Sequence, residues 1–381
     1  MGTGHTVVIN WSGNEFELEN TVKSDCKTII RTIWHSFGVV ICGGSVLLIA
    51  SSAPAQNLFV SCAGTGSIVE ITPTGTVSTF VSGLDNPRGL AFDSSGDLYE
   101  ADQGSGNIYE FIYQDGTLSS TPVLFSSGLN APYGLAFNTG TGNLFVSEYS
   151  NNDVLEITPG GSQSVFATGL NGPEQIAFLG TNELFVANRN GNTVDEISMA
   201  GQPTTYTSGL SAPAGLAIEG NIPWASNQGN GVLDDLGQVS GGSPRAMASG
   251  LNDPSDLAYN GLILYEADTG SGKINEFTVQ IVGLKVKVIE TTFASGLDGP
   301  VGLAFQPPPS LQAVGAGIQT NQFGFTLIGT NNEIVIVEAC TNLVNNVWSL
   351  LATNTLTNGS SYFSDSQWTN YSSRYYRLYS P

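Results

Sequence analysis

One phrase recurs six times along this chain and constrains its fold more than any other feature. It reads Ser or Thr, Gly, Leu, two residues, Pro, one residue, and then Gly-Leu-Ala-Phe or a near variant. The Gly-Leu pairs follow one another at intervals of 40 to 46 residues, beginning at Gly83, Gly128, Gly169, Gly209, Gly250 and Gly296. A period of this length predicts one supersecondary unit per repeat, with each unit packed on its neighbours.

Each repeat contains four short strand-like runs separated by Gly- and Asn-rich turns, such as residues 97–102 and 107–111. A single four-stranded sheet cannot bury both of its faces, but copies arranged radially pack face to face and leave only short edges. The 47 glycines and the low charge content suit such a turn-rich architecture. We therefore predict an all-β protein with a six-bladed β-propeller over residues 57–305.

The ends of the repeat region predict how the ring closes. Residues 58–61, 67–71 and 77–81 resemble the second, third and fourth strands of a unit, whereas residues 301–305 resemble a first strand alone. Together they make one blade of three strands plus one. A solenoid is the alternative, but it would leave these partial units as unpaired edges.

The N-terminal region is typical of a secretory signal. Lys27 and Arg31 precede the apolar run 37–50, and small residues up to Ala55 follow it. We assign residues 27–55 to a signal peptide and expect a secreted or extracytoplasmic protein, with no membrane span after cleavage. A retained anchor is the alternative. Residues 1–26 have no interpretable pattern and suggest a misassigned start.

A second, smaller unit follows the repeats. Residues 306–317 are rich in Pro and Gly and are predicted to be a linker. Residues 318–381 contain alternating runs at 323–328 and 333–338, together with several aromatic residues. They predict a small β-rich domain.

Charge and cysteine content exclude some partners and compartments. The formal net charge is −21, and the segment after residue 56 has eight Lys and Arg against twenty-eight Asp and Glu. No basic stripe is available for phosphate contacts, so a nucleic acid partner is not expected. Cys62 and Cys340 are far apart in the sequence. We expect no structural disulfide between them.

The phrases Pro-x-Gly-Leu-Ala-Phe, Gly-x-Leu-Tyr/Phe-Val-Ala-Asp/Asn and Gly-Asn-x-Val/Ile-x-Glu-Ile resemble the NHL-repeat propellers. They are more loosely similar to the SMP-30/gluconolactonase and streptogramin-lyase propellers. This resemblance covers residues 57–305 and is specific for architecture rather than activity. The phrase at 338–343, with Trp348 and the run 374–378, resembles C-terminal β-domains of secreted proteins from verrucomicrobia-like bacteria.

Histidine content argues against the enzymatic mechanisms that these resemblances imply. His5 and His35 are the only histidines, and both precede the predicted cleavage site. A Ser-His-Asp or Cys-His nucleophile is thus excluded from the cleaved chain. Streptogramin lyases are understood to use histidine near a metal, so that resemblance does not extend to mechanism here.

The lactonase resemblance implies a metal held above the central channel by residues placed between the repeated Pro and Gly-Leu. These positions hold Arg88, Tyr133, Glu174, Ala214, Ser255 and Val301. Only Glu174 has a side chain suited to metal coordination, and Asp256 could assist it. Calcium takes about six to eight oxygen ligands, so one carboxylate does not make that site.

A second ring of candidates stands where each second strand enters its turn. Its members are Cys62, Asp102, Glu148, Asn188, Asn227 and Asp268. If these side chains point into the channel mouth, they could bind a polar ligand, or Ca2+ or another divalent cation through Asp102, Glu148 and Asp268 with Glu174. The alternative is that they bond backbone amides within the turn.

Three further features of the repeats are candidates for a functional role: a recurring carboxylate, a single tryptophan and an insertion. A carboxylate recurs eight residues later in every unit, and a solvated or cross-strand role is expected for it: the set is Glu70, Glu110, Glu156, Glu196, Asp235 and Glu276. Trp224, the only tryptophan of the propeller, could stack on a ligand at the channel mouth or fill the space between blades. An insertion at 279–288 departs from the repeat.

These observations predict a secreted, non-catalytic binding or scaffold module, expected to be a monomer, whose partner is an extracellular protein, a glycan or a small polar ligand. The alternative is a metal-dependent hydrolase or lactonase of the SMP-30 type that uses a cation at the channel mouth.

Overall fold

The computed structural model describes residues 39–42, 45–48, 56–114, 117–261, 263–282, 285–307, 312–319, 322–328, 334–340, 349–357, 360–367 and 375–379. Every regular element among them is a strand. The chain divides into two units, Met1–Ser51 and Ser52–Pro381. None of the described residues forms a helix with the length and apolar character needed to cross a membrane.

In the first unit, β1 (Val39–Cys42) and β2 (Ser45–Leu48) form an antiparallel pair. Both strands lie inside the predicted signal peptide. The rest of residues 27–55, and all of residues 1–26, lie outside the described residues, so these two predictions stay predictions.

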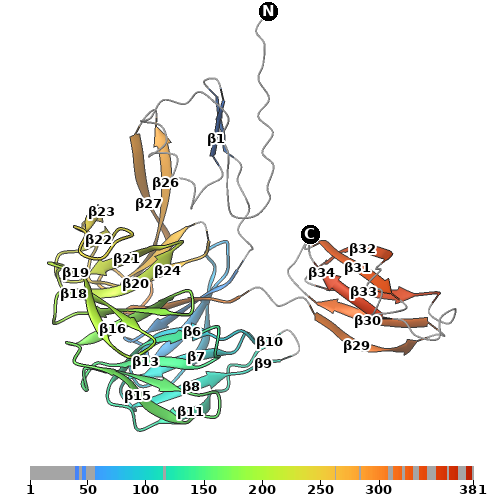
Figure 1. Cartoon of the computed structure of the whole chain (residues 1–381), viewed down its shortest axis with the longest axis horizontal. Helices are drawn as coiled ribbons and strands as arrows, with labels where there is room; N and C mark the ends of the chain where they lie inside the picture. Colours follow the sequence, from blue (N-terminus) through green and yellow to red (C-terminus); the bar gives the residue numbers. More distant parts are fainter. Residues whose placement is uncertain are drawn as a thin grey trace, which may run out of the picture. The chain divides into compact units, whose positions relative to one another are not determined.

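Six four-stranded antiparallel sheets make up the propeller, as predicted (Figure 1). The strands nearest the axis are β28 (Pro300–Phe305), β6 (Pro87–Phe92), β12 (Pro132–Phe137), β16 (Pro173–Leu179), β20 (Pro213–Glu219) and β24 (Pro254–Tyr259). The second strands are β3 (Leu58–Cys62), β7 (Leu98–Asp102), β13 (Leu144–Glu148), β17 (Glu183–Asn188), β21 (Ile222–Asn227) and β25 (Leu264–Asp268).

The two outer strands of each blade follow in the same order. The third strands are β4 (Ser67–Ile71), β8 (Asn107–Phe111), β14 (Asp153–Ile157), β18 (Thr193–Ser198), β22 (Val232–Asp235) and β26 (Lys273–Val282). The outermost strands are β5 (Val77–Ser82), β11 (Val123–Ser127), β15 (Gln163–Thr168), β19 (Pro203–Ser208), β23 (Arg245–Ser249) and β27 (Lys285–Ser295). A small hairpin, β9 (Tyr113–Gln114) and β10 (Thr117–Leu118), precedes β11.

The ring closes through the predicted composite blade. β28 pairs antiparallel with β3, with Leu303 opposite Val60 and Phe305 opposite Leu58. Each innermost strand also contacts the innermost strand of the next blade, from β28 through β6 to β24 and back to β28. These contacts exclude the solenoid alternative and define a central channel lined by the first strands.

The core of the described propeller consists of one apolar cluster between each pair of neighbouring blades. An aromatic side chain of the second strand recurs at the centre of most of these clusters. Phe59, Tyr99, Phe145 and Tyr265 each contact, edge to face, an aromatic ring of the following blade's first strand. Apolar burial thus links blade to blade rather than filling a single central core.

The insertion at 279–288 lengthens the hairpin of β26 and β27, whose pairing continues to Val282 opposite Lys285. The C-terminal region forms two three-stranded sheets, as predicted for a β-rich domain. One contains β29 (Gln312–Gln319), β30 (Gln322–Ile328) and β33 (Ser360–Asp365); the other contains β32 (Ser349–Thr355), β31 (Ile334–Cys340) and β34 (Tyr375–Tyr379). β29 begins inside the stretch that composition assigned to a linker.

Candidate functional site

The second ring of sequence candidates lies where each second strand ends, opposite the repeated proline. Asp102 pairs with Pro87 and Asp268 with Pro254. Their carboxylates accept hydrogen bonds from backbone N–H groups of the loop before that proline: Asp85 N lies 2.9 Å from Asp102 Oδ2, and Asn252 N lies 3.1 Å from Asp268 Oδ2. These oxygens therefore cap loops of their own blades.

The other oxygen-bearing members of the ring make the same contact. Asn188 Oδ1 lies 3.2 Å from Asn171 N, and Asn227 Oδ1 lies 3.1 Å from Ser211 N. Glu148 accepts a hydrogen bond from Asn130 N. Among the described residues, no three His, Cys, Asp or Glu side chains are grouped so that they could hold a metal ion. The suggested cation ligands Asp102, Glu148, Asp268 and Glu174 are therefore not gathered into one set.

The acidic set of the third strands makes contacts within its own blades. Glu110 accepts a hydrogen bond from Tyr99 Oη at 2.6 Å, Glu156 from Asn143 Nδ2 at 2.6 Å, and Glu276 from Thr291 Oγ1 at 2.8 Å. Asp235 forms an ion pair with Arg245 at 2.6 Å. These contacts agree with the cross-strand role expected for the set.

Trp224 is only 7% exposed and packs with Leu233, Leu257 and Phe277 between two blades. It stands where the other second strands carry Phe or Tyr. The sequence left two roles open for Trp224, stacking on a ligand or filling the space between blades. The structure places it between the blades.

A polar pocket of about 490 Å³ lies at the end of the channel where the first strands begin. Two rings supply its lining. One is the position after the repeated proline, and the other is the residue that follows each second-strand candidate. The lining residues are Asn86, Arg88, Gln103, Gly104, Ala131, Tyr133, Tyr149, Glu174, Arg189 and Gln228.

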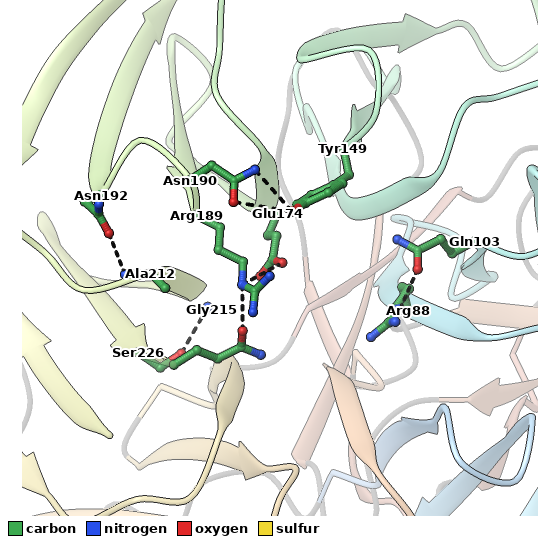
Figure 2. A network of polar contacts seen from close by, with 11 residues as sticks. Arg88, Gln103, Tyr149, Glu174, Arg189, Asn190, Asn192, Ala212, Gly215 and Ser226 are labelled. Atoms are coloured by element: carbon green, nitrogen blue, oxygen red, sulfur yellow. Dashed lines mark hydrogen bonds and ion pairs between the residues drawn. The ribbon is translucent and has the colours of Figure 1, made fainter. Parts of the chain in front are cut away.

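Arg88 is held at this pocket by Gln103 and Tyr133, and Figure 2 shows its hydrogen bond with Gln103. Its Nε donates to Gln103 Oε1 at 3.1 Å, and Gln103 Oε1 also accepts from Asn86 Nδ2 at 2.8 Å. The Arg88 guanidinium lies over the ring of Tyr133, 5.3 Å from its centroid. A carboxamide and a cation–π contact thus fix the orientation of the guanidinium.

Arg189 comes from a different blade and is held in a similar way. Its Nε donates to Gln228 Oε1 at 2.8 Å and lies 3.4 Å from Glu174 Oε1. Tyr149 exchanges hydrogen bonds with Asn190 beside it, as Figure 2 shows. The negative charge of Glu174 and a hydrogen bond with Tyr149 raise the pKa of Arg189 despite its partial burial.

Glu174 is the only acidic side chain in the pocket lining, and it is 4% exposed. Burial raises its pKa to about 7, although Arg189 and Arg88 act in the opposite direction. Asp253 raises the pKa further, and a hydrogen bond with Tyr133 lowers it. The second carboxyl oxygen, Oε2, is buried and has no hydrogen-bond partner in the described structure. The group can therefore gain or lose a proton near neutral pH.

One residue further along the first strands, Gln175 and Asp256 bridge the channel. Gln175 Nε2 donates to Asp256 Oδ2 at 2.6 Å and so joins β16 to β24, which are separated in the ring by β20. Asp256 also accepts hydrogen bonds from the backbone N–H groups of Leu303 and Leu257. Burial raises the pKa of Asp256 to about 7. Gly215, at the same position of β20, lets β20 approach β24 closely, because a Cβ there would lie 2.6 Å from the Asp256 Cα.

The sequence analysis treated the residues after the repeated proline only as possible metal ligands. For the second ring it selected the last residue of each second strand, whereas the next residue lines the pocket. Successive residues of a strand point to opposite faces, so the neighbours of the capping residues reach the pocket instead. The missed residues are Gln103, Tyr149, Arg189 and Gln228. These four side chains are larger and more varied than the mostly Asp and Asn residues that precede them. This difference could have indicated a site in the sequence.

No family model matches this chain, and no curated protein does. A chain from the crystal structure of a nidogen/laminin complex aligns with a TM-score of 0.57 and 18% identity, covering 66% of this chain and 98% of that chain. A streptogramin B lyase structure aligns with a TM-score of 0.50 and 15% identity, covering 77% and 95%. An auxiliary nutrient binding protein from Bacteroides ovatus aligns with a TM-score of 0.51 and 11% identity, covering 64% and 68%. At these identities the likeness supports the six-bladed propeller fold and does not extend to activity.

Proposed function

We propose that this chain is a non-catalytic, extracellular binding module and that its propeller binds a small polar ligand, or the polar end of a larger partner, in the channel-mouth pocket. The observation that carries the proposal is the pocket of about 490 Å³, within the usual range for small-molecule sites. Its polar side chains are already held by hydrogen bonds to one another, so little ordering is needed on binding.

Other features support a binding role outside the cell. The apolar run before Ala55 resembles a signal peptide, and the repeat resembles those of NHL propellers. Propellers of similar shape occur in a nidogen/laminin complex and in a nutrient binding protein. Both histidines precede residue 36, which leaves the propeller without the commonest general base.

A screen of sugars, sugar acids, amino acids and short peptides by thermal shift tests this proposal. A ligand that binds only the native state raises the melting temperature with the logarithm of its concentration. We expect at least one class of small polar ligand to do so, and we expect Gln228→Trp, which fills the pocket, to remove the shift. Gln202→Trp, at an exposed position outside both described cavities, is the matched control. Shifts that persist in Gln228→Trp would place binding elsewhere.

One observation favours a second function, the hydrolase alternative. A buried carboxyl with a pKa of about 7 beside two arginines is suited to general acid–base chemistry. If the pocket is catalytic, the full chain turns over lactones or simple esters, with or without added Ca2+, and Glu174→Gln abolishes turnover while ligand binding persists. Absence of turnover by the wild-type chain across such a panel would leave the binding function alone.

A further inference from the structure

Positive charge is scarce in this propeller, and two of its six basic residues line one pocket. Residues 57–305 contain three arginines and three lysines, in a chain of net charge −21. Arg88 and Arg189 both line the channel-mouth pocket, whereas the third, Arg245, is paired with Asp235 elsewhere. A larger cavity of about 710 Å³ between the fourth and fifth blades contains Glu183 and Glu196 but no cationic side chain. Of these two described cavities, the channel-mouth pocket is the one with cationic side chains, so it is the one suited to bind an anion.

The contacts of the two arginines leave most of their terminal N–H groups available, since Arg189 has one further hydrogen bond, with Tyr149. Arg88 uses Nε for Gln103 and forms no ion pair among the described residues. Arg189 uses Nε for both Gln228 and Glu174. A guanidinium held through Nε still presents its two terminal nitrogens as a fork, which matches the two oxygens of a carboxylate. Both forks line the same pocket.

The aromatic residues of the pocket do not offer a stacking platform for a neutral sugar. Tyr133 is 6% exposed as a residue and has the Arg88 guanidinium over its ring. The Tyr149 hydroxyl is bonded to Asn190. Recognition in this pocket must therefore depend on charge and hydrogen bonding more than on apolar contact.

Glu174 restricts which anion can be bound. When its carboxyl is protonated, Glu174 carries no charge and leaves both arginines free to attract an anion. When ionised, it neutralises part of the arginine charge and repels a second negative charge. Asp253 adds to this repulsion. When Glu174 is ionised, a singly charged carboxylate is therefore accommodated better than a phosphate dianion.

We propose that the channel-mouth pocket binds a small ligand through a carboxylate group held between the terminal guanidinium nitrogens of Arg88 and Arg189. This inference rests on the proposed binding function and names the chemical class of its ligand. The net charge of −21 disfavours polyanions as ligands, whereas salt screens its effect on a small acid within about 8 Å.

Ligand-observed NMR with matched pairs of probes tests the proposal on the full chain. The pairs are glucuronate with glucose and acetate with acetamide, and inorganic phosphate is a separate probe. We expect each carboxylate to bind at least tenfold more tightly than its neutral partner, and glucuronate more tightly than phosphate at pH 8. Arg88→Gln and Arg189→Gln should each weaken glucuronate binding at least tenfold, whereas Arg245→Gln should leave it unchanged.

A pH series adds a measurement that a merely structural effect of these variants would not reproduce. Glucuronate affinity should fall several-fold between pH 6 and pH 8 as Glu174 ionises, because binding of an anion favours the protonated form. In Glu174→Gln the affinity should stay constant over this range. Circular dichroism of every variant confirms folding.

The outcomes separate this inference from the function on which it rests. If glucose and glucuronate bind equally and Gln228→Trp removes both, the pocket is a binding site and the carboxylate assignment is wrong. The same conclusion follows if phosphate binds more tightly than glucuronate at pH 8. If neither carboxylate binds, the assignment is overturned, and the wider ligand screen then decides the binding function by itself.

Discussion

Glu100 occupies a position that is apolar in the neighbouring second strands. Val60, Val146 and Val186 stand at the equivalent place, yet Glu100 is fully buried and neither of its carboxyl oxygens has a hydrogen-bond partner in the described structure. Burial and the nearby Asp102 raise its pKa well above the usual range, against a smaller opposing effect of the Arg88 backbone N–H. A buried polar group without a partner costs about 1–3 kcal/mol.

We expect Glu100→Val to raise the free energy of unfolding at pH 7 by about that amount in urea titrations, whereas the exposed Glu290→Val should change little. A destabilised Glu100→Val would show that the carboxyl has a partner that these contacts do not reveal.

The buried carboxyls Glu100, Glu174 and Asp256 also predict the pH dependence of stability. Their folded-state pKa values are raised, to about 7 for Glu174 and Asp256. The native state therefore retains protons that the unfolded state, with a pKa near 4, has released, so stability falls as pH rises from about 4 through 7. We expect a lower urea midpoint at pH 8 than at pH 6, with a smaller difference in Glu100→Val. A midpoint that rises over this interval would contradict these protonation states.

At the residue scale, the sequence predicted the capping positions better than the pocket. Repetition identified Asp102, Asn188 and Asp268 because capping a repeated loop requires a side-chain oxygen at the same position of successive blades. Arg189 and Gln228 serve a site that occurs once, so no repetition could identify them. Burial of Glu100 was equally hidden, because a strand of five residues gives no period long enough to separate a core glutamate from a surface one.

At the scale of the elements, close approach between first strands depends on the glycine of the repeated phrase. A Cβ at Gly134 would lie 2.5 Å from the Glu174 carbonyl oxygen of the next blade. Ser147 reinforces the same junction, since its Oγ accepts from Gly134 N at 2.8 Å and donates to the Glu174 carbonyl. The sequence predicted these strands and their order. It could not show that the glycine is required for close contact between blades and not for a turn.

We therefore expect Gly134→Ala to destabilise the protein by about 1–3 kcal/mol, as overpacking of a rigid interior does. Gly160→Ala is the matched control, because a Cβ there would have no neighbour closer than 4.0 Å. It should be neutral or stabilising by up to about 1 kcal/mol. Urea titration of both variants measures the difference. Equal effects would mean that the first strands can separate without cost.

Closure of the propeller ring is the whole-molecule property that the sequence predicted most clearly. Partial units at the two ends of a repeat array must complete each other, because otherwise they remain as open edges. The C-terminal sheets could be predicted only as β-rich, since no repeat fixes the pairing of their strands. In the composite blade, β28 buries Val301 and Leu303 and covers the edge of β3. These contacts join residues more than 240 positions apart, so they also restrain the first and last blades against separation.

A chain of residues 57–298 should therefore lose the cooperative thermal transition that a chain of residues 57–306 retains. The shorter chain leaves the β28-facing backbone N–H and C=O groups of β3 unpaired and the apolar cluster around Leu58 and Val60 partly exposed, both of which favour aggregation. The longer chain differs from it only by β28 and its immediate neighbours, and both lack the C-terminal sheets. A synthetic peptide of residues 299–306 should restore the transition in the shorter chain if strand pairing is what closes the ring. Equal melting of the two chains without the peptide would mean that five blades and three strands are held together by their mutual packing alone.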